Sequence, residues 1–251
     1  MTQRPSGKTT QAAIVTGVSR GLGEAIAAEL LARGFVVLGV GRANSARLAG
    51  RHYQFVTCDL SIPGVAAAPL SPALRDLAGL QPRAVTLVNN AAVASPARVV
   101  GDLDAAEIES AIATNLTAPL VLADLFLRAF RDDAVERRVL NISSGAAQSA
   151  IPGSSVYCAS KAGLEMATRA LASENHGPRF RSIALRPGIF DTAMQAYMRA
   201  QDPASFPSAG LFRGFKEKQL LKHPAEVAAR VVERLILAPV EHGHVYTHTD
   251  L

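Results

Sequence analysis

Short apolar runs alternate with longer amphipathic stretches along most of the chain. Seven of these runs are almost continuously apolar, a pattern typical of parallel strands that are covered on both faces. The expected strands are 12–17 (AAIVTG), 35–42 (FVVLGVGR), 53–60 (YQFVTCDL), 84–92 (AVTLVNNAA), 138–144 (RVLNISS), 181–188 (RSIALRPG) and 244–248 (HVYTH).

Between the strands, apolar residues recur with helical spacing. The expected helices are 23–33, 104–130, 154–174 and 224–237, and Pro119 is expected to break the second. Alternation of strands and helices implies right-handed crossovers. We therefore predict an α/β fold: a single-domain, doubly wound, Rossmann-type parallel sheet of about seven strands with helices on both faces.

One domain is expected to span residues 1–251, since no linker or repeat interrupts the pattern. Two segments depart from it. The polar start, 1–10, is expected to be flexible, and the irregular stretch 190–222 is interpreted as a lid over a substrate.

Composition narrows the class of protein. The 251 residues are 49% hydrophobic, enough for a sizeable core. The two cysteines, Cys58 and Cys158, and the six histidines show no metal-like spacing, so we expect a reducing compartment and no metal site. Absence of a secretory signal and of a long apolar run predicts a cytoplasmic protein without a membrane span. The net charge is +5, but the Arg and Lys residues are scattered along the chain, which argues against nucleic-acid binding.

The first strand ends in a glycine-rich turn, TGVSRGLG, that opens the first helix. Gly17 permits a tight turn, and the missing side chains at Gly21 and Gly23 let backbone N–H groups approach a pyrophosphate. The positive end of the helix adds a favourable partial charge. This turn predicts a dinucleotide-binding site.

Tyr157 and Lys161 are four residues apart, so on a helix they lie on one face. A phenol with a pKa of about 10 is a poor acid or base near neutrality. An ammonium group nearby favours the phenolate, so we expect Lys161 to lower the pKa of Tyr157.

These features resemble the short-chain dehydrogenase/reductase family, whose nucleotide loop has the spacing T-G-x-x-x-G-x-G. Further motifs follow in the order of that family over nearly the whole chain. They are CDL (58–60), NNAA (89–92, with Ala92 where the family has glycine), TNL (114–116), NISSG (141–145), YCASK (157–161) and RPGIFDT (186–192).

The resemblance implies four catalytic residues. Ser144, thirteen residues before Tyr157, would donate a hydrogen bond to a substrate carbonyl, and Ser143 is the second choice for this role. Tyr157 would protonate the developing alkoxide, and Lys161 would also bind the nicotinamide ribose. Asn115 would hold a water that links Lys161 to solvent, or would act as a helix amide bonded to backbone.

The cofactor expected from the residues is NADP(H). Arg42 ends the second strand where NAD-dependent folds place an acid, and Arg20 lies in the glycine loop; both guanidinium groups suit a 2′-phosphate. Asp59 would flank the adenine or cap its own strand. Glycine loop and resemblance together imply a cofactor site of Gly17, Ser19, Arg20, Gly21, Leu22, Gly23, Arg42, Asp59, Leu60, Asn90, Tyr157, Lys161, Pro187, Gly188, Ile189 and Thr192.

Segments near the C-terminus are similar to the benzil reductase and sepiapterin reductase subgroup of the family, which implies a small aromatic or vicinal-diketone substrate. Met194 and Asp250 are the expected substrate contacts, Asp250 as an anchor for a pterin ring. Aromatic residues of the lid are expected to line an apolar pocket or to pack the insert against the body. They are Tyr197, Phe206, Phe212 and Phe215.

Two other functions stay open on the sequence: a β-ketoacyl reductase acting on an acyl carrier, and an NADPH-sensing protein without turnover. The family resemblance also implies a homodimer or homotetramer formed through the helices 104–130 and 154–174.

Overall fold

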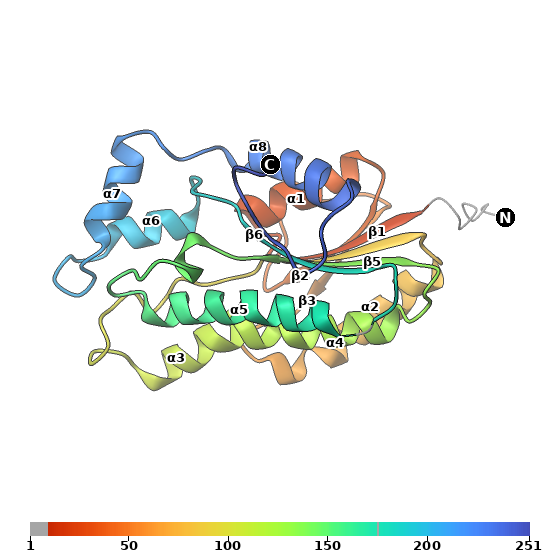
Figure 1. Ribbon diagram of the computed structural model, residues 1–251, viewed down its shortest axis with the longest axis horizontal. Helices are drawn as coiled ribbons and strands as arrows, with labels where there is room; N and C mark the ends of the chain where they lie inside the picture. Colours follow the sequence, from red (N-terminus) through yellow and green to blue (C-terminus); the bar gives the residue numbers. More distant parts are fainter. Residues whose placement is uncertain (1–9, 175) are drawn as a thin grey trace.

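One parallel sheet forms the centre of the protein in the computed structural model, which describes residues 10–174 and 176–251 (Figure 1). Its seven strands lie in the order β3-β2-β1-β4-β5-β6-β7. Their bounds are β1 Gln11–Thr16, β2 Val36–Gly41, β3 Tyr53–Thr57, β4 Ala84–Asn89, β5 Glu136–Ile142, β6 Phe180–Arg186 and β7 Val245–Thr247. The predicted doubly wound sheet is confirmed. The flexible start expected at 1–10 falls almost wholly outside the described residues.

Helices cover both faces of this sheet (Figure 1). α1 and α8 pack on one face in a cluster with Ile26 and Val231, and α2 and α4 pack on the other in a cluster with Leu70 and Phe126. The helices are α1 Gly21–Ala32, α2 Ala67–Gly79, α3 Ala105–Ile112, α4 Ala118–Ala129, α5 Ser155–Ser173, α6 Ala193–Ala200, α7 Ala209–Glu217 and α8 Pro224–Val231.

The helix expected at 104–130 is not broken at Pro119. It passes through a π-helical turn, Ala113–Thr117, and Pro119 follows this turn as the second residue of α4. The hydrogen-bond pattern already departs from the regular α-helical one there, which accommodates a residue without an N–H. The helical run Ala105–Ala129 is long and apolar enough to cross a membrane, judged by its length and composition. Its buried residues Leu122 and Phe126 belong to the core on the sheet, so we interpret it as a core helix.

The insert 190–222 is not irregular, as the sequence had suggested, because it contains α6 and α7. Thr192 caps α6, accepting a hydrogen bond from the backbone N–H of Gln195 at 3.4 Å. The two ends of the insert meet in an isolated bridge between Phe190 and Lys222. The insert is therefore a helical excursion of the chain whose two ends are held together by this bridge.

Candidate active site

The glycine loop lies where the strand order reverses, between β1 and β4. In doubly wound sheets this switch point is where ligands bind. Gly17 has a positive φ of 72° and donates its N–H to Val40 O at 2.8 Å. Asn90, at the end of β4, donates from Nδ2 to Thr16 O at 2.9 Å and Gly17 O at 3.3 Å. The Asn90 side chain thus fixes the start of the glycine loop to the segment that follows β4.

Gly23 shows why the loop requires glycine. A Cβ atom there would lie 2.3 Å from Asn90 Nδ2 and 2.4 Å from Gly17 O, far inside contact distance. Among the described residues, no side chain caps the first turn of α1. Its N–H groups therefore remain available to an anionic ligand, which is what a dinucleotide pyrophosphate needs. The residues present fit the expected cofactor.

Arg20 and Arg42 are both exposed at this end of the sheet. Ser45, three residues after Arg42, donates a hydrogen bond to Glu24 of α1, which holds the loop after β2 against the glycine loop. Asp59 accepts hydrogen bonds from Ser61 N at 3.0 Å and Ser61 Oγ at 2.8 Å, and these together with the charge of Arg42 lower the pKa of its carboxyl. The capping role of Asp59 is therefore present in the structure.

Tyr157, Lys161 and Ser144 lie together at the start of α5 and the end of β5. The hydroxyl of Ser144 accepts from Ala146 N at 3.2 Å and lies close enough to the Tyr157 phenol to lower its pKa. Lys161, only 2% exposed, donates from Nζ to Ile142 O at 2.8 Å and lies 5.8 Å from the centroid of the Tyr157 ring. Ser143 points elsewhere, to Glu165. Of the two serines, Ser144 is the one beside the tyrosine.

Burial sets the pKa values of this pair. Desolvation raises the pKa of Tyr157 above its ordinary 10.0, while the hydrogen bond with Ser144 acts to lower it. Desolvation also lowers the pKa of Lys161 to about 8. The expectation that Lys161 lowers the pKa of Tyr157 is wrong for this arrangement, because the phenol is desolvated and the ammonium is bonded to a carbonyl. A neutral phenol here is a proton donor.

Asn115 lies in the π-helical turn and is fully buried. Its Oδ1 accepts from Val93 N at 2.8 Å, and its Nδ2 donates to Val93 O at 2.8 Å and to Ser160 Oγ at 3.2 Å. The side chain is thus a helix amide bonded to backbone, one of the two expected roles. It ties the loop after β4 to α5.

The segment 187–192 closes the other side of the crevice. Gly188 has a positive φ of 81°, and Thr192 Cγ2 lies 3.4 Å from where a Cβ on Gly21 would be. The glycine loop and the segment after β6 are therefore neighbours. Pro187 is buried, whereas Ile189 is half-buried. Leu22 and Leu60 are buried, and Ser19 is exposed.

The insert forms the wall next to Tyr157, the tyrosine expected to be catalytic. Tyr157 and Met194 are partly buried against a separate apolar cluster, whose buried members include Met198, Phe206 and Phe212. Gly153 is needed beneath it, since a Cβ there would lie 2.5 Å from the Phe206 ring. Tyr197, by contrast, is exposed. The lid aromatics thus mainly pack the insert onto the body.

The C-terminal segment reaches the site from β7. His248 lies against Gly188, 3.2 Å from the position of a Cβ. Asp250 Oδ2 accepts from Thr247 N at 2.6 Å and Thr247 Oγ1 at 2.8 Å, which lowers the pKa of its carboxyl. Asp250 therefore shapes its own turn with one carboxylate oxygen.

Several supporting residues were given no role by the sequence, although Thr16 and Ser160 lie within motifs quoted above. Thr16 Oγ1 accepts the N–H groups of Asn90 and Ala91, each at 2.9 Å. Ser160 and Glu165 support the site from α5. Their partners are distant in the sequence, so only the packing of β4, β5 and α5 reveals them.

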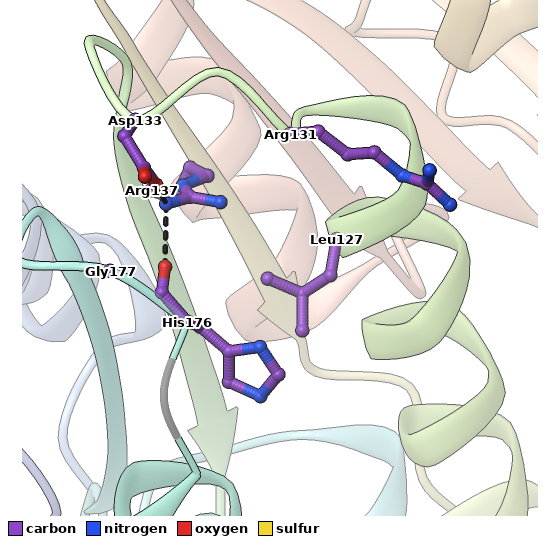
Figure 2. A pocket seen from close by; sticks show the side chains of 6 residues that line it. All are labelled: Leu127, Arg131, Asp133, Arg137, His176 and Gly177. Carbon is purple, nitrogen blue, oxygen red and sulfur yellow. Dashed lines mark hydrogen bonds and ion pairs between the residues drawn. The ribbon is translucent and has the colours of Figure 1, made fainter.

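A hollow of about 350 Å³ lies at the opposite end of the sheet (Figure 2). Arg137 spans it, donating to Asp133 Oδ1 and to His176 O, each at 2.6 Å. β5 begins at Glu136 beside this hollow, whereas Ser144 and Tyr157, two of the residues expected to be catalytic, follow its other end. None of the predicted site residues lines this hollow. Its lining residues are Leu127, Arg131, Asp133, Arg137, His176 and Gly177.

Fold and site together define a nicotinamide-dependent oxidoreductase. The model of the short chain dehydrogenase family matches residues 11–203, so the chain belongs to the short-chain dehydrogenase/reductase family. Its members act on carbonyl and alcohol groups with a nicotinamide cofactor.

Individual relatives are similar over most of their length. The benzil reductase ((S)-benzoin forming) of Bacillus subtilis (strain 168) is 32% identical over 235 residues, which cover 93% of this chain and 96% of that enzyme. The sepiapterin reductase of Mus musculus is 34% identical over 217 residues, 76% and 79% of the two chains. The crystal structure of the KRED1-Pglu enzyme matches with a TM-score of 0.81 and 26% identity, over 94% of this chain and 100% of the other.

Proposed function

We propose that this protein is an NADPH-dependent reductase of small aromatic or vicinal-diketone carbonyl compounds. The observation that carries the proposal is the group formed by Ser144, Tyr157 and Lys161 at the carboxyl end of β5, beside the glycine loop. The similarity to enzymes named benzil reductase and sepiapterin reductase supports the substrate class.

Each catalytic side chain has a distinct task in the proposed reaction. The nicotinamide, when bound, supplies the hydride. Ser144 holds the substrate carbonyl oxygen by a hydrogen bond, and Tyr157 donates the proton that this oxygen gains. Burial keeps the phenol protonated, so the proton is in place, and Ser144 acts to lower the pKa of the phenol and so eases release of that proton. Lys161 binds the ribose and passes a proton back to Tyr157, with Asn115 fixing the backbone beside this path.

The preference for NADP(H) is proposed from the two exposed arginines, Arg20 and Arg42. Each lies next to the expected ribose side of the cofactor, and guanidinium groups bind a phosphate in bidentate fashion. The residues proposed to hold the cofactor are those expected from the sequence, with Gly17, Gly21 and Gly23 at the pyrophosphate. Pro187, Gly188, Ile189 and Thr192 form the opposite side.

The substrate is proposed to lie between Tyr157 and the insert 190–222, which acts as its lid. Met194 contributes an adaptable apolar contact at this wall. Asp250 is proposed to contact a pterin through Oδ1, because its Oδ2 is occupied by Thr247.

Turnover of benzil and of sepiapterin, followed by the loss of NADPH absorbance, tests this function. The wild type is expected to reduce at least one of them faster with NADPH than with NADH. Tyr157→Phe is expected to lower kcat by about 10²–10⁴-fold and to keep the affinity for NADPH. Wild-type rates in the variant would remove Tyr157 from its role. Turnover only of a β-ketoacyl carrier, or tight NADPH binding without any turnover, would establish one of the alternative functions.

We also propose a homodimer or homotetramer in the cytoplasm. Leu120 on α4 is 47% exposed and Met166 on α5 is 62% exposed, so each of the two helices expected at the interface presents an apolar side chain to its surroundings.

A further inference from the structure

A buried carboxylate lies on α5 one turn beyond the catalytic lysine. Glu165 follows Lys161 by four residues, and its side chain is 5% exposed. The mechanism proposed above gives it no task. Burial acts to raise the pKa of Glu165, but hydrogen bonds from Arg186 and Ser143 outweigh it and hold the pKa below its ordinary value.

Glu165 binds the ends of two neighbouring strands at once. Ser143 Oγ donates to Oε1 at 2.6 Å. Arg186, whose side chain is 12% exposed, donates from Nε to Oε1 at 2.7 Å and from Nη2 to Oε2 at 2.5 Å. Such a two-pronged pair fixes orientation as well as distance. Glu165 therefore joins α5 to the end of β5 and the end of β6.

Both partners of Glu165 directly precede residues of the site. Ser143 precedes Ser144, and Arg186 precedes Pro187 at the start of the segment that flanks the glycine loop. Along β5 and α5 the contacts follow one another: Ser144 with Tyr157, Ile142 O with Lys161, and Ser143 with Glu165.

We propose that Glu165, through Ser143 and Arg186, is a positioning residue for the reaction: it sets Ser144 and the turn 187–188 against the helix that carries Tyr157 and Lys161. The inference rests on the proposed function, because it concerns the same site. A merely structural ion pair would stabilise the fold without affecting the geometry of the two segments.

Replacing both partners separates stability from positioning. Removal of one partner leaves a buried charge unpaired, so Glu165→Ala is expected to lower the unfolding midpoint by about 10 °C. An apolar pair of similar volume is often as stable as a buried ion pair, so Glu165→Met/Arg186→Met is expected to unfold within a few degrees of the wild type.

The double variant is nevertheless expected to lose about 100-fold in kcat, because a small misplacement of reacting groups has an effect of this size. Its hydrogen exchange, measured without cofactor, is expected to rise at 143–147 and 188–192 and to stay unchanged in α1. Its affinity for NADPH is expected to fall about tenfold. Glu165→Gln keeps the shape and one acceptor and is expected to lie between wild type and double variant.

The proposal would be overturned if the double variant had the kcat, hydrogen exchange and NADPH affinity of the wild type as well as its unfolding midpoint. If the double variant fails to fold, Glu165→Gln takes its place, and wild-type values of kcat and hydrogen exchange in that variant would overturn the proposal. The control is Glu29→Met/Arg33→Met, an ion pair of 2.7 Å on α1 with both side chains about one-third exposed, which is expected to change none of the three readouts. If the proposed function is wrong, the wild type will show no turnover. In that case the hydrogen exchange and the NADPH affinity of the variants still test the positioning role of Glu165.

Discussion

Lys161 is a residue whose ionisation bears directly on the stability of the fold. Its ammonium is buried, and the pKa falls from 10.5 to about 8, which corresponds to about 3 kcal/mol. A cation whose pKa is lower in the folded protein destabilises the fold while it is protonated in both states. Below pH 8 this cost is complete, and it is relieved as the pH rises from about 8 to 10.5.

We therefore expect wild type to gain stability over Lys161→Met by about 3 kcal/mol between pH 8 and pH 10.5. Urea denaturation of both proteins at several pH values without cofactor measures this difference. A constant difference across the range would show that the ammonium is not desolvated in the fold.

Gly23 gives a second prediction at this scale. Gly23→Ala forces a Cβ against Gly17 O and Asn90 Nδ2, so the phosphate loop must shift. We expect a fall in NADPH affinity of at least about tenfold and a lower unfolding midpoint. Calorimetric titration measures the affinity.

The matched control is Gly79→Ala near the end of α2, where a Cβ meets nothing within 4 Å. It is expected to keep cofactor binding and to gain up to about 1 kcal/mol of stability, since alanine favours the helix. Equal effects of the two substitutions would contradict the tight packing of the loop.

Individual site residues could be predicted where chemistry and spacing coincide. The glycines and the pair Tyr157 and Lys161 stand in local patterns that the sequence displays. Their partners could not be predicted, because Ile142 O and Val93 are backbone groups that reach Lys161 and Asn115 only after the sheet has formed. The direction of the Tyr157 pKa was missed for the same reason, since desolvation depends on packing.

At the scale of elements, the insert is a small apolar unit resting on the body. Phe206 is fully buried, and the centroid of its ring lies 5.8 Å from that of Phe212. Its ring also occupies the space that a Cβ atom at Gly153 would need. Phe206→Ala removes most of this contact and is expected to cost about 3–5 kcal/mol of stability.

Because this cluster also supports the wall beside Tyr157, the same substitution is expected to raise KM for the carbonyl substrate about tenfold and to leave NADPH affinity unchanged. Steady-state kinetics and cofactor titration separate the two effects. A variant that loses cofactor affinity equally would show that the insert supports the whole crevice.

The elements were predicted in proportion to the strength of their local pattern. All seven strands were predicted because buried parallel strands are continuously apolar. Helix α2 was not predicted, since it contains Pro72 and its sequence resembles a loop. The helices α6 and α7 were obscured by the proline and glycine residues around them.

At the scale of the whole molecule, the sheet order brings segments from across the chain to one edge. The alternation of strands and helices predicted the doubly wound sheet, but it left the strand order and the oligomeric state open. We expect Leu120→Glu and Met166→Glu, separately and together, to dissociate the proposed oligomer, because each places a charge in an apolar contact.

Light scattering during size-exclusion chromatography measures the mass of each variant. Asp124→Ala on α4 is the control, because this exposed side chain pairs with Arg128 of its own helix. A wild type that elutes as a monomer would contradict the proposed assembly.

The π-helical turn at 113–117 has a consequence for changing the length of this chain. Such a turn holds one residue more than an α-helical turn, so deletion of one residue there would restore regular spacing. The side chains before and after the turn would then keep their faces of the helix, because only the extra residue is removed. Asn115, which lies within the turn, would lose the widened backbone from which it bonds to Val93. Libraries of shortened variants should therefore avoid this helix and draw their deletions from exposed connections such as 131–134.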